Sequence, residues 1–428
     1  MKQGWEIKTI GDVCKVIAGQ SPEGKFYNDN GNGLPFYQGK KEYGEKFIGE
    51  PTTWTSKVTK EAEANDILMS VRAPVGPINF ATQKICIGRG LAAIRATKLI
   101  DKEFLFNFLL KHENEIVGNT GAVFNSINKA QIEAIQIPLP PLPEQQSIVA
   151  ILDEAFAAIA KAKANAEQNL KNAKELFASY VQTVFENKGK DWVEKTLGEI
   201  ADVEYGYTDK STEEGDYRYV RITDIDKNGE LILDDRKYIK HTKEAEGFLI
   251  QDNDLLMART GATFAKVLLF NGDEPSVFAS YLIRIKFKEK IENALYWHFT
   301  KTKNYWEQAN SLQSGAAQPH FNGAAVKQVV FAFPKSVKEQ KSLIEKFETL
   351  SIETKKLEAI YQQKIKDLEE LKKSVLQKAF GGELSESGFV GLKDKQDFKR
   401  NEKKILTSSQ LENPNSDNYL ANPQILKS

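Results

Sequence analysis

Hydrophobic residues recur every three or four positions in two long stretches of the chain, which predicts two long helices. The spacing is that of a heptad seam, the pattern typical of a coiled coil. The first seam is rich in Ala and the second in Leu, Phe and Tyr, so we expect the two helices to pair, in antiparallel orientation. The seam residues that we expect to make this pairing are Ile148, Leu152, Ile159, Leu170, Phe177, Leu343, Phe347, Leu350, Leu357, Leu368 and Leu371.

The segments between these helices have a different pattern. Short runs of alternating or continuous apolar residues, such as "RYVRITDI" and "SYLIRIKF", are separated by turn-rich loops and predict strands. Stretches such as "KEFLFNFLLKHENEI" have helical spacing. The sequence therefore predicts globular parts of mixed α/β content, and an α+β fold for the whole chain.

Four blocks of sequence occur twice, in the same order and at nearly constant spacing. The blocks "WEIKTIGDV", "NDILM", "INKAQIEAIQIPLP" and "EQQSIVAIL" return as "WVEKTLGEI", "NDLLM", "FNGAAVKQVVFAFP" and "EQKSLIEKF". Two copies of one unit, each a globular part followed by a long helix, account for this order. The predicted parts are residues 1–143 (first globular domain), 144–187 (central helix), 188–337 (second globular domain), 338–384 (C-terminal helix) and 385–428 (polar tail).

Each globular part meets its helix at a proline-containing junction. Four prolines lie between Pro138 and Pro143, and Pro334 holds the matching place in the second copy. Proline fixes φ and removes a backbone donor, so it ends the preceding strand. Glu144 and Glu339 then fall in the first helical turn, where negative charge suits the helix dipole. We interpret the junction as a stiff joint between globular part and helix.

Composition excludes several classes of protein. The 428 residues contain 59 Lys and Arg and 59 Asp and Glu, so the formal net charge is zero, and a nucleic-acid role must rest on local patches or on a partner. Two cysteines exclude a disulfide framework or a Cys-rich metal site. The apolar runs are too short for a membrane span and the first residues have no signal core, so we expect a cytoplasmic protein with no membrane contact.

The repeated blocks resemble the specificity subunit of type I restriction–modification enzymes. "PLPPLPEQQSIVAILDEAFAAIAKAKANAEQNLKNAKELFASYV" is similar to the family's central conserved region, and "LKKSVLQKAFGGEL" to its C-terminal end. "WEIKTIGDV", "WVEKTLGEI", "NDILM" and "NDLLMARTG" resemble recurring marks of its target-recognition domains. The resemblance covers residues 1 to about 384, and order, spacing and repeat all agree.

The resemblance implies a non-catalytic subunit that reads double-stranded DNA. Each target-recognition domain would read one half of a bipartite, asymmetric site, and the coiled coil would set the gap and hold two modification (methyltransferase) subunits. Restriction-translocation subunits would join through the complex. No cofactor is expected on this chain, whereas S-adenosylmethionine, ATP and magnesium are expected on partner subunits. Helices of about 60 Å could hold two readers about 34 Å, one DNA turn, apart.

Base reading requires forked or paired hydrogen-bonding groups, such as those of Arg, Lys, Asn and Gln. Loops that follow strands are where such side chains project. In the first domain we predict DNA contacts by Gln20, Ser21, Lys25, Tyr27, Tyr37, Gln38, Lys40, Lys41, Arg72, Asn119 and Thr120. In the second domain we predict contacts by Tyr207, Thr208, Lys210, Tyr219, Arg221, Thr223, Arg259, Thr260, Gln313, Ser314 and Gln318. Arg72 and Arg259 are expected to occupy matching places, because each follows the repeated "NDILM" or "NDLLM" strand. Each of the other residues could instead be an ordinary surface side chain.

The sequence gives weaker support for a phosphate-binding, metal-binding or catalytic site. "GQSPEGKF" imitates a phosphate-binding loop, but Phe26 replaces the metal-binding hydroxyl. The four histidines lack metal-ligand spacing, and Asp66 and Asp254 suit a turn better than catalysis. The alternative to DNA recognition is a coiled-coil scaffold or adaptor that does not bind DNA, a reading that zero net charge favours.

Overall fold

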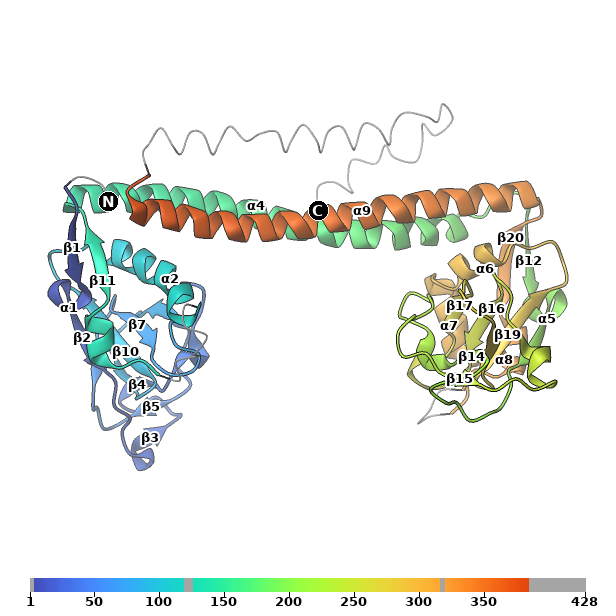
Figure 1. The fold of residues 1–428 in the computed structure, drawn as a ribbon, viewed down its shortest axis with the longest axis horizontal. Helices are drawn as coiled ribbons and strands as arrows, with labels where there is room; N and C mark the ends of the chain where they lie inside the picture. The colour runs from blue at the N-terminus through green and yellow to red at the C-terminus, as the bar shows by residue number, and fades with distance from the viewer. Residues whose placement is uncertain (1–3, 119–125, 316–319, 385–428) are drawn as a thin grey trace. The chain divides into compact units, whose positions relative to one another are not determined.

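The computed structural model describes residues 4–118, 126–315 and 320–384. The chain divides into two compact units, of which the first comprises Met1–Lys163 and Lys366–Ser428 and the second Ala164–Ile365. Each unit contains a globular head and parts of two long helices (Figure 1). We call the globular parts head 1 (residues 4–141) and head 2 (residues 187–336).

The described helices are α1 (Ile10–Val13), α2 (Lys102–Gly118), α3 (Lys129–Glu133), α4 (Leu142–Glu186), α5 (Leu197–Ile200), α6 (Asn293–Phe299), α7 (Lys303–Leu312), α8 (Gly323–Gln328) and α9 (Val337–Gly381). The long helices α4 and α9 begin and end within about three residues of the predicted limits. Among the helices that the structure describes, none combines the length and the apolar character that crossing a bilayer requires.

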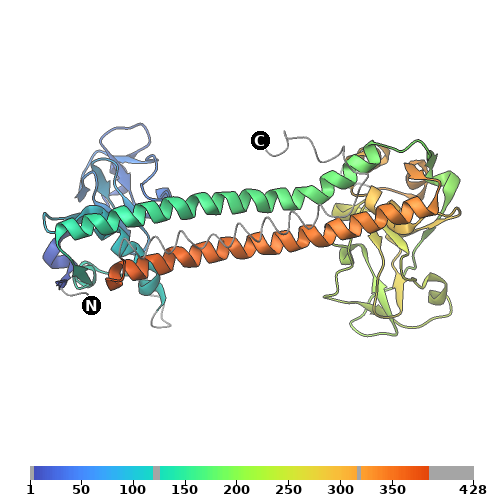
Figure 2. The same cartoon turned by 90° about the horizontal axis from the view of Figure 1, so that it is seen from above.

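In the first unit the start of α4 packs against the end of α9 in antiparallel orientation (Figure 2). Further along α4 the partners lie earlier in α9. Lys372 Nζ lies 5.1 Å from the centroid of the Phe156 ring, and Lys163 Nζ lies 2.8 Å from Glu369 Oε1. The predicted antiparallel pairing of the two helices is therefore confirmed.

The predicted seam residues are buried or half-buried along both helices. Near the end of α4 the buried positions are Val181 and Phe185, which follow Phe177 in steps of four. Steps of four rather than alternating threes and fours turn the apolar stripe out of the heptad seam, because a straight helix has 3.6 residues per turn. The stripe thereby enters the core of head 2, where Phe185 packs against Phe299 and Phe331.

The described residues of head 1 form three small sheets. The strands are β1 (Glu6–Thr9), β2 (Cys14–Ala18), β3 (Tyr27–Asn28), β4 (Leu34–Tyr37), β5 (Trp54–Thr55), β6 (Glu61–Ala62), β7 (Ile67–Ser70), β8 (Ile78–Phe80), β9 (Ile85–Ile87), β10 (Leu91–Ala96) and β11 (Gln136–Leu139). The sheet orders are β1-β11, β2-β10-β7-β8 and β3-β5-β4-β9-β6. The β4–β9 pair is parallel and the other paired strands are antiparallel.

Head 2 repeats two of these sheets and the parallel pair of the third, which has three strands here. Its strands are β12 (Trp192–Thr196), β13 (Ala201–Tyr205), β14 (Tyr217–Val220), β15 (Tyr238–Ile239), β16 (Leu255–Ala258), β17 (Val267–Leu269), β18 (Ser276–Phe278), β19 (Leu282–Phe287) and β20 (Val330–Pro334). The orders β12-β20 and β13-β19-β16-β17 match those of head 1, and β14 pairs with β18 in parallel as β4 does with β9. The internal repeat of the sequence is thus a repeat of the fold.

Repeated sequence motifs have repeated local roles. Thr9 with Asp12, and Thr196 with Glu199, form capping boxes at the starts of α1 and α5. The Asn of each "ND" pair adopts a left-handed conformation, with φ of 71° at Asn65 and 69° at Asn253. Asp66 and Asp254 accept backbone N–H groups three residues upstream, so their predicted turn role is confirmed.

The Gln of each repeated "EQ" pair joins a head to its own helix. Gln145 is fully buried at the start of α4, and its side-chain oxygen accepts the N–H of Asp101 at 2.7 Å. Its side-chain nitrogen donates to the carbonyls of Leu99 (3.3 Å) and Pro140 (2.8 Å). One side chain thus connects the loop before α2, the end of β11 and the first turn of α4.

Gln340 makes the same three contacts in the second unit. Its oxygen accepts the N–H of Glu292 at 2.9 Å, and its nitrogen donates to the carbonyls of Lys290 (3.2 Å) and Pro334 (2.8 Å). Gln340 is also fully buried. Gln145 and Gln340 thus make equivalent contacts, which is consistent with a junction that occurs twice. We call each set of three hydrogen bonds the buried Gln clamp, and it adds to the stiffness that proline provides.

Candidate nucleic-acid interface

In head 1 the structure brings together two loops that the sequence predicted separately. Ser21 Oγ donates to Gln38 Oε1 at 3.0 Å and accepts the N–H of Arg89 at 3.1 Å. The N–H of Gln20 donates to the carbonyl of Ile87. Loops 19–27 and 37–41 therefore meet at the turn that contains Arg89.

Arg89 is a candidate that the sequence analysis missed. It is exposed and lies between Gly88 and Gly90, in the turn that joins β9 to β10. Its guanidinium has no hydrogen-bond or ion-pair partner among the described residues. A solitary Arg in a "GRG" turn beside two predicted loops was the signal that could have identified it.

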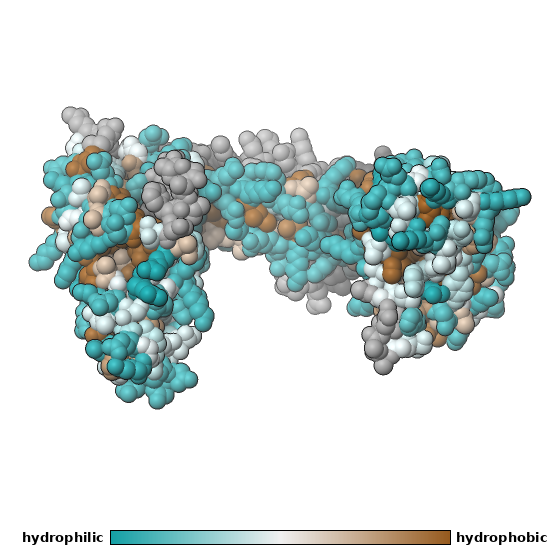
Figure 3. Space-filling model, turned by 60° about the horizontal axis from the view of Figure 1, so that its bottom comes forward, coloured by the Kyte–Doolittle hydropathy of each residue, from teal (hydrophilic) through white to brown (hydrophobic). Residues whose placement is uncertain are grey.

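The lysines of this end of head 1 are exposed. Lys25 forms an ion pair with Glu23 at 2.7 Å. The ammonium groups of Lys25 and Lys57 both lie over the ring of Phe26. Lys40 and Lys41 lie in a short 3-10 helix (Lys40–Glu42). Figure 3 shows that hydrophilic side chains dominate the lower end of head 1 in that view. Tyr27 is half-buried, and its hydroxyl donates to the carbonyl of Pro22.

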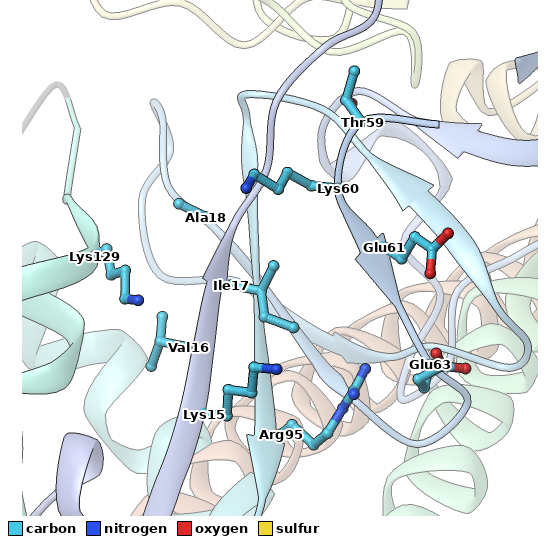
Figure 4. A pocket seen from close by; sticks show the side chains of 10 residues that line it. All are labelled: Lys15, Val16, Ile17, Ala18, Thr59, Lys60, Glu61, Glu63, Arg95 and Lys129. Carbon is cyan, nitrogen blue, oxygen red and sulfur yellow. The ribbon is translucent and has the colours of Figure 1, made fainter. Parts of the chain in front are cut away.

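A hollow of about 580 Å³ lies along the outer edge of β2, and its lining includes four basic side chains and the acidic Glu61 and Glu63 (Figure 4). Lys15, Lys60 and Lys129 line it, together with Arg95, whose guanidinium is held by Asp66 at 2.7–2.8 Å. Lys15 and Lys60 have no ion-pair partner in the described part of the chain. The hollow adjoins the candidate loop 19–27, because the hydroxyl of Thr59, which also lines it, donates to the carbonyl of Gln20. Unpaired ammonium groups in such a hollow can contact phosphate oxygens.

Two aromatic candidates are structural. Tyr37 is 1% exposed and donates its hydroxyl to the carbonyl of Gly49, and burial raises its pKa to about 12. Tyr219 is 5% exposed and donates to the carbonyl of Tyr207. These hydroxyls hold neighbouring loops, so we correct the prediction that the two side chains face DNA.

Two further candidates of head 2 are also committed to internal contacts. Arg221 binds Asp224 through Nε (3.2 Å) and Nη2 (2.7 Å), and this ion pair raises the pKa of Arg221. Thr260 is 3% exposed and pairs through its backbone with His320. Arg221 therefore caps a turn, and its predicted base contact stays a prediction, whereas the prediction for Thr260 is corrected because this residue is buried in a β-bridge.

The structure also corrects the pairing of the two arginines that follow the "NDILM" and "NDLLM" strands. The N–H of Val71 donates to the carbonyl of Gly90, and the N–H of Arg259 donates to that of Tyr281. Val71 is therefore the counterpart of Arg259, and Arg72, which is exposed and bridges to Ser126, is the counterpart of Thr260. Because neighbouring residues of an extended segment point to opposite faces, Arg72 and Arg259 are not equivalent.

The remaining candidates of head 2 lie on accessible segments. Thr208, Lys210 and Thr223 are exposed, and Tyr207 is half-buried with its hydroxyl 3.4 Å from that of Thr242. Ser314 is exposed, and Gln313 is half-buried with an Oε1 that has no partner among residues 4–118, 126–315 and 320–384. The predicted residues Asn119, Thr120 and Gln318 lie outside the described residues.

The described residues do not include a group of three or more His, Cys, Asp and Glu side chains that could hold a metal ion. His298 illustrates the role of a buried histidine. Its ring packs against that of Phe347 in α9, with 4.7 Å between the two ring centroids, and burial lowers the pKa of His298 to about 3. Lys301, which lies 3.1 Å from the centroid of the Trp297 ring, has a pKa that burial lowers to about 8.

The sequence matches one family over most of its length. The type I restriction modification DNA specificity domain matches twice, over residues 2–171 and 189–369. Among curated proteins, the chain is 41% identical over 186 residues to a Methanocaldococcus jannaschii protein named for the specificity subunit of the type I restriction enzyme MjaX, a match that spans 42% of this chain and 43% of that protein. It is 23% identical to the MjaVIII specificity subunit of the same organism, over 89% of this chain and 93% of that subunit.

Two solved structures share the fold. One comes from work on complex assembly and conformational transition of the type I R-M system, with a TM-score of 0.71, 17% identity and coverage of 90% of this chain and 99% of that chain. The other is the HsdS subunit from Thermoanaerobacter tengcongensis, with a TM-score of 0.62, 18% identity and coverage of 90% and 98%. At these identities the likeness concerns the fold.

Proposed function

We propose, from the premise that this chain belongs to the family of the type I restriction modification DNA specificity domain, that it is the DNA-reading subunit of a type I restriction–modification complex. In this role head 1 and head 2 each read one half of a split, asymmetric DNA site. The pairing of α4 with α9 sets the gap between the half-sites and offers the surface on which two modification subunits dock. The chain itself performs no chemistry.

The observation that carries the proposal is a repeated framework with differing loops. The two heads share sheet order, capping boxes, "ND" turns and the buried Gln clamp. The loop ends differ: head 1 presents Arg89 and several lysines, whereas head 2 presents Arg259 and Tyr281. A common scaffold with different donors at its loop ends suits two readers of different base sequences, because side-chain contacts to base edges specify sequence.

The proposal assigns the remaining chemistry to partners in the cytoplasm. S-adenosylmethionine would bind the modification subunits, and ATP and magnesium would bind restriction-translocation subunits that join through the complex. A formal net charge of zero leaves this chain short of attraction for phosphates, so tight binding requires partners that contribute positive charge. A scaffold without DNA binding is the alternative, and neither the family nor the exposed basic loops favour it.

Salt dependence of DNA binding tests the proposal. Fluorescence anisotropy with a labelled duplex measures affinity for the chain alone and for the chain assembled with its modification subunits, between about 50 and 200 mM salt. We expect weak binding by the chain alone. We expect tight, sequence-specific binding by the complex that falls steeply with salt, by about 10³–10⁵ if six to ten phosphates are contacted. An assembled complex that binds no duplex even at low salt would support the scaffold instead.

A further inference from the structure

We propose that Arg259 reads a guanine in the half-site of head 2, with Tyr205 and Tyr281 holding its guanidinium in place. This inference rests on the proposed function and specifies which residue of head 2 carries one base preference. It is drawn from three features of Arg259: its stacking, its unpaired donors and its absence from the matching place in head 1.

Two exposed tyrosines hold the guanidinium. The Arg259 guanidinium carbon lies 5.2 Å from the ring centroid of Tyr205 and 5.3 Å from that of Tyr281, and it lies over both rings. Tyr205 is itself fixed, because its hydroxyl accepts the N–H of Gly323 at 2.8 Å. Tyr205 and Tyr281 are 43% and 53% exposed, so the stack that they form with Arg259 lies at the surface of head 2. A planar guanidinium stacked on aromatic faces has a restricted orientation.

The donors of this guanidinium have no partner within the described chain. Arg259 Nε is buried without a hydrogen bond, and the two terminal nitrogens are neither buried nor hydrogen-bonded. By contrast, Arg284 in the neighbouring strand β19 is bound by Glu204 and Asp254. A buried donor without a partner is rare in native proteins and calls for a ligand, a water or a functional role. The free terminal nitrogens form the fork that matches guanine O6 and N7.

The segment that ends at Ser314 carries a second unpaired polar atom among the described residues. Gln313 Oε1 is buried and has no partner within the described part of the chain, and Gln313 precedes Ser314. Ser314 and Thr260 both pair with His320, so the segment after Arg259 and the segment after Gln313 belong to one ladder. Two segments of this ladder thus each carry a polar side-chain atom without a partner among the described residues, one a donor and one an acceptor, and base edges present both kinds of group.

Head 1 has none of these side chains at the matching backbone positions. Val71 is the counterpart of Arg259 and Gly90 that of Tyr281, as the equivalent backbone hydrogen bonds establish. Ala18 corresponds to Tyr205, because each is the last residue of its strand and precedes a glycine. The N–H of Gly19 donates to the carbonyl of Leu91, the first residue of β10, and the N–H of Gly206 donates to that of Leu282, the first residue of β19. A stabilising role for the fold would be expected in both repeats. The restriction of this group to one head therefore indicates a role in what that head reads.

The test measures base discrimination by the complete complex of this chain with its modification subunits. The duplexes carry the split DNA motif that the complex methylates, or versions of it with a single base pair replaced in one half-site. The affinity of the complex for each duplex is measured for wild type, Arg259→Ala and Arg259→Gln. Wild type should prefer guanine at one position of one half-site by about 5- to 150-fold, the range of one bidentate contact. Both variants should lose this preference to within about 2-fold while every other position keeps its own. Tyr281→Leu should weaken the preference at that same position only.

Lys288→Gln is the matched control. Tyr281 directly precedes β19 and Lys288 directly follows it, so the two residues lie at opposite ends of this strand. The Lys288→Gln substitution therefore removes a charge from head 2 without changing Arg259 or its two tyrosines. Thermal unfolding and assembly with the modification subunits establish that each variant folds. Uniform weakening on all duplexes, with discrimination retained, would make Arg259 a phosphate contact and overturn the inference. Unchanged discrimination would also overturn it. If wild type binds no sequence preferentially, the proposed function itself fails, and that outcome is recognisable before any variant is made.

Discussion

Replacing Gln340 by Leu should destabilise the second unit, because its side chain closes three hydrogen bonds in a fully buried place. The change removes the acceptor of the Glu292 N–H and the donor to the carbonyls of Lys290 and Pro334. Leu is similar in volume, so the cost comes from polar groups rather than from a cavity.

The magnitude follows from the contacts. A hydrogen bond contributes about 1 kcal/mol net, and each buried group left unpaired costs about 1–3 kcal/mol. Some relief comes from water that reaches the loop, so we expect a loss of about 2–4 kcal/mol in the free energy of unfolding. For a domain of this size that corresponds to a fall in melting temperature of roughly 5–15 °C. Gln145→Leu should have a similar effect in the first unit, because its three contacts are the same.

Circular dichroism during thermal unfolding measures the effect, and hydrogen exchange of the Glu292 amide localises it. Gln362→Leu is the control, because Gln362 is exposed on the same helix α9. An exposed substitution should change the free energy of unfolding by no more than about 0.5 kcal/mol. If Gln340→Leu melts within a degree or two of Gln362→Leu, the buried clamp does not hold head 2 to α9, and the reasoning is refuted.

Three further predictions concern single side chains. Burial lowers the pKa of His298 to about 3, so between about pH 3 and 6.5 only the unfolded chain binds a proton at this residue. The free energy of unfolding should therefore fall as the pH drops through that window, by up to about 1.4 kcal/mol per pH unit. In urea denaturation, His298→Asn should show a flatter decline of the midpoint with falling pH. Asn253→Val, at a φ of 69°, should cost about 1–2 kcal/mol in chemical denaturation, whereas Asn253→Gly should be tolerated; equal effects would contradict a conformational cause. Phe380→Ala should destabilise head 1 by about 3–5 kcal/mol, because Phe380 packs against Phe104 and Phe108; an unchanged melting temperature would contradict it.

The repeat and the long helices could be predicted from sequence because their signals are local. Heptad spacing marks α4 and α9, and ordered blocks such as "NDILM" and "NDLLM" mark equivalent strands and turns. The end of the α4 stripe could not be predicted, because Val181 and Phe185 follow the shape of the head 2 core rather than the heptad. The role of Gln145 was hidden as well, since its partners at residues 99–101 lie far away in sequence.

The candidate interface was only partly predictable. Residue type identified exposed donors such as Lys40 and Arg72, but it could not separate them from Tyr37 and Tyr219, whose hydroxyls turn inward. Burial depends on strand register, and a one-residue shift exchanges the faces of a strand. The same effect led to the pairing of Arg72 with Arg259, which the backbone hydrogen bonds correct.

A map of methylated adenines tests the central claim most directly. The chain is co-expressed with its cognate modification subunit in cells that lack adenine methylation, and long-read sequencing compares them with cells that lack this chain. DNA specification by two heads predicts new methylation at one split motif, two short specified blocks around an unspecified gap. No new methylation, in cells where the complex is shown to assemble, would contradict the claim and leave a scaffold.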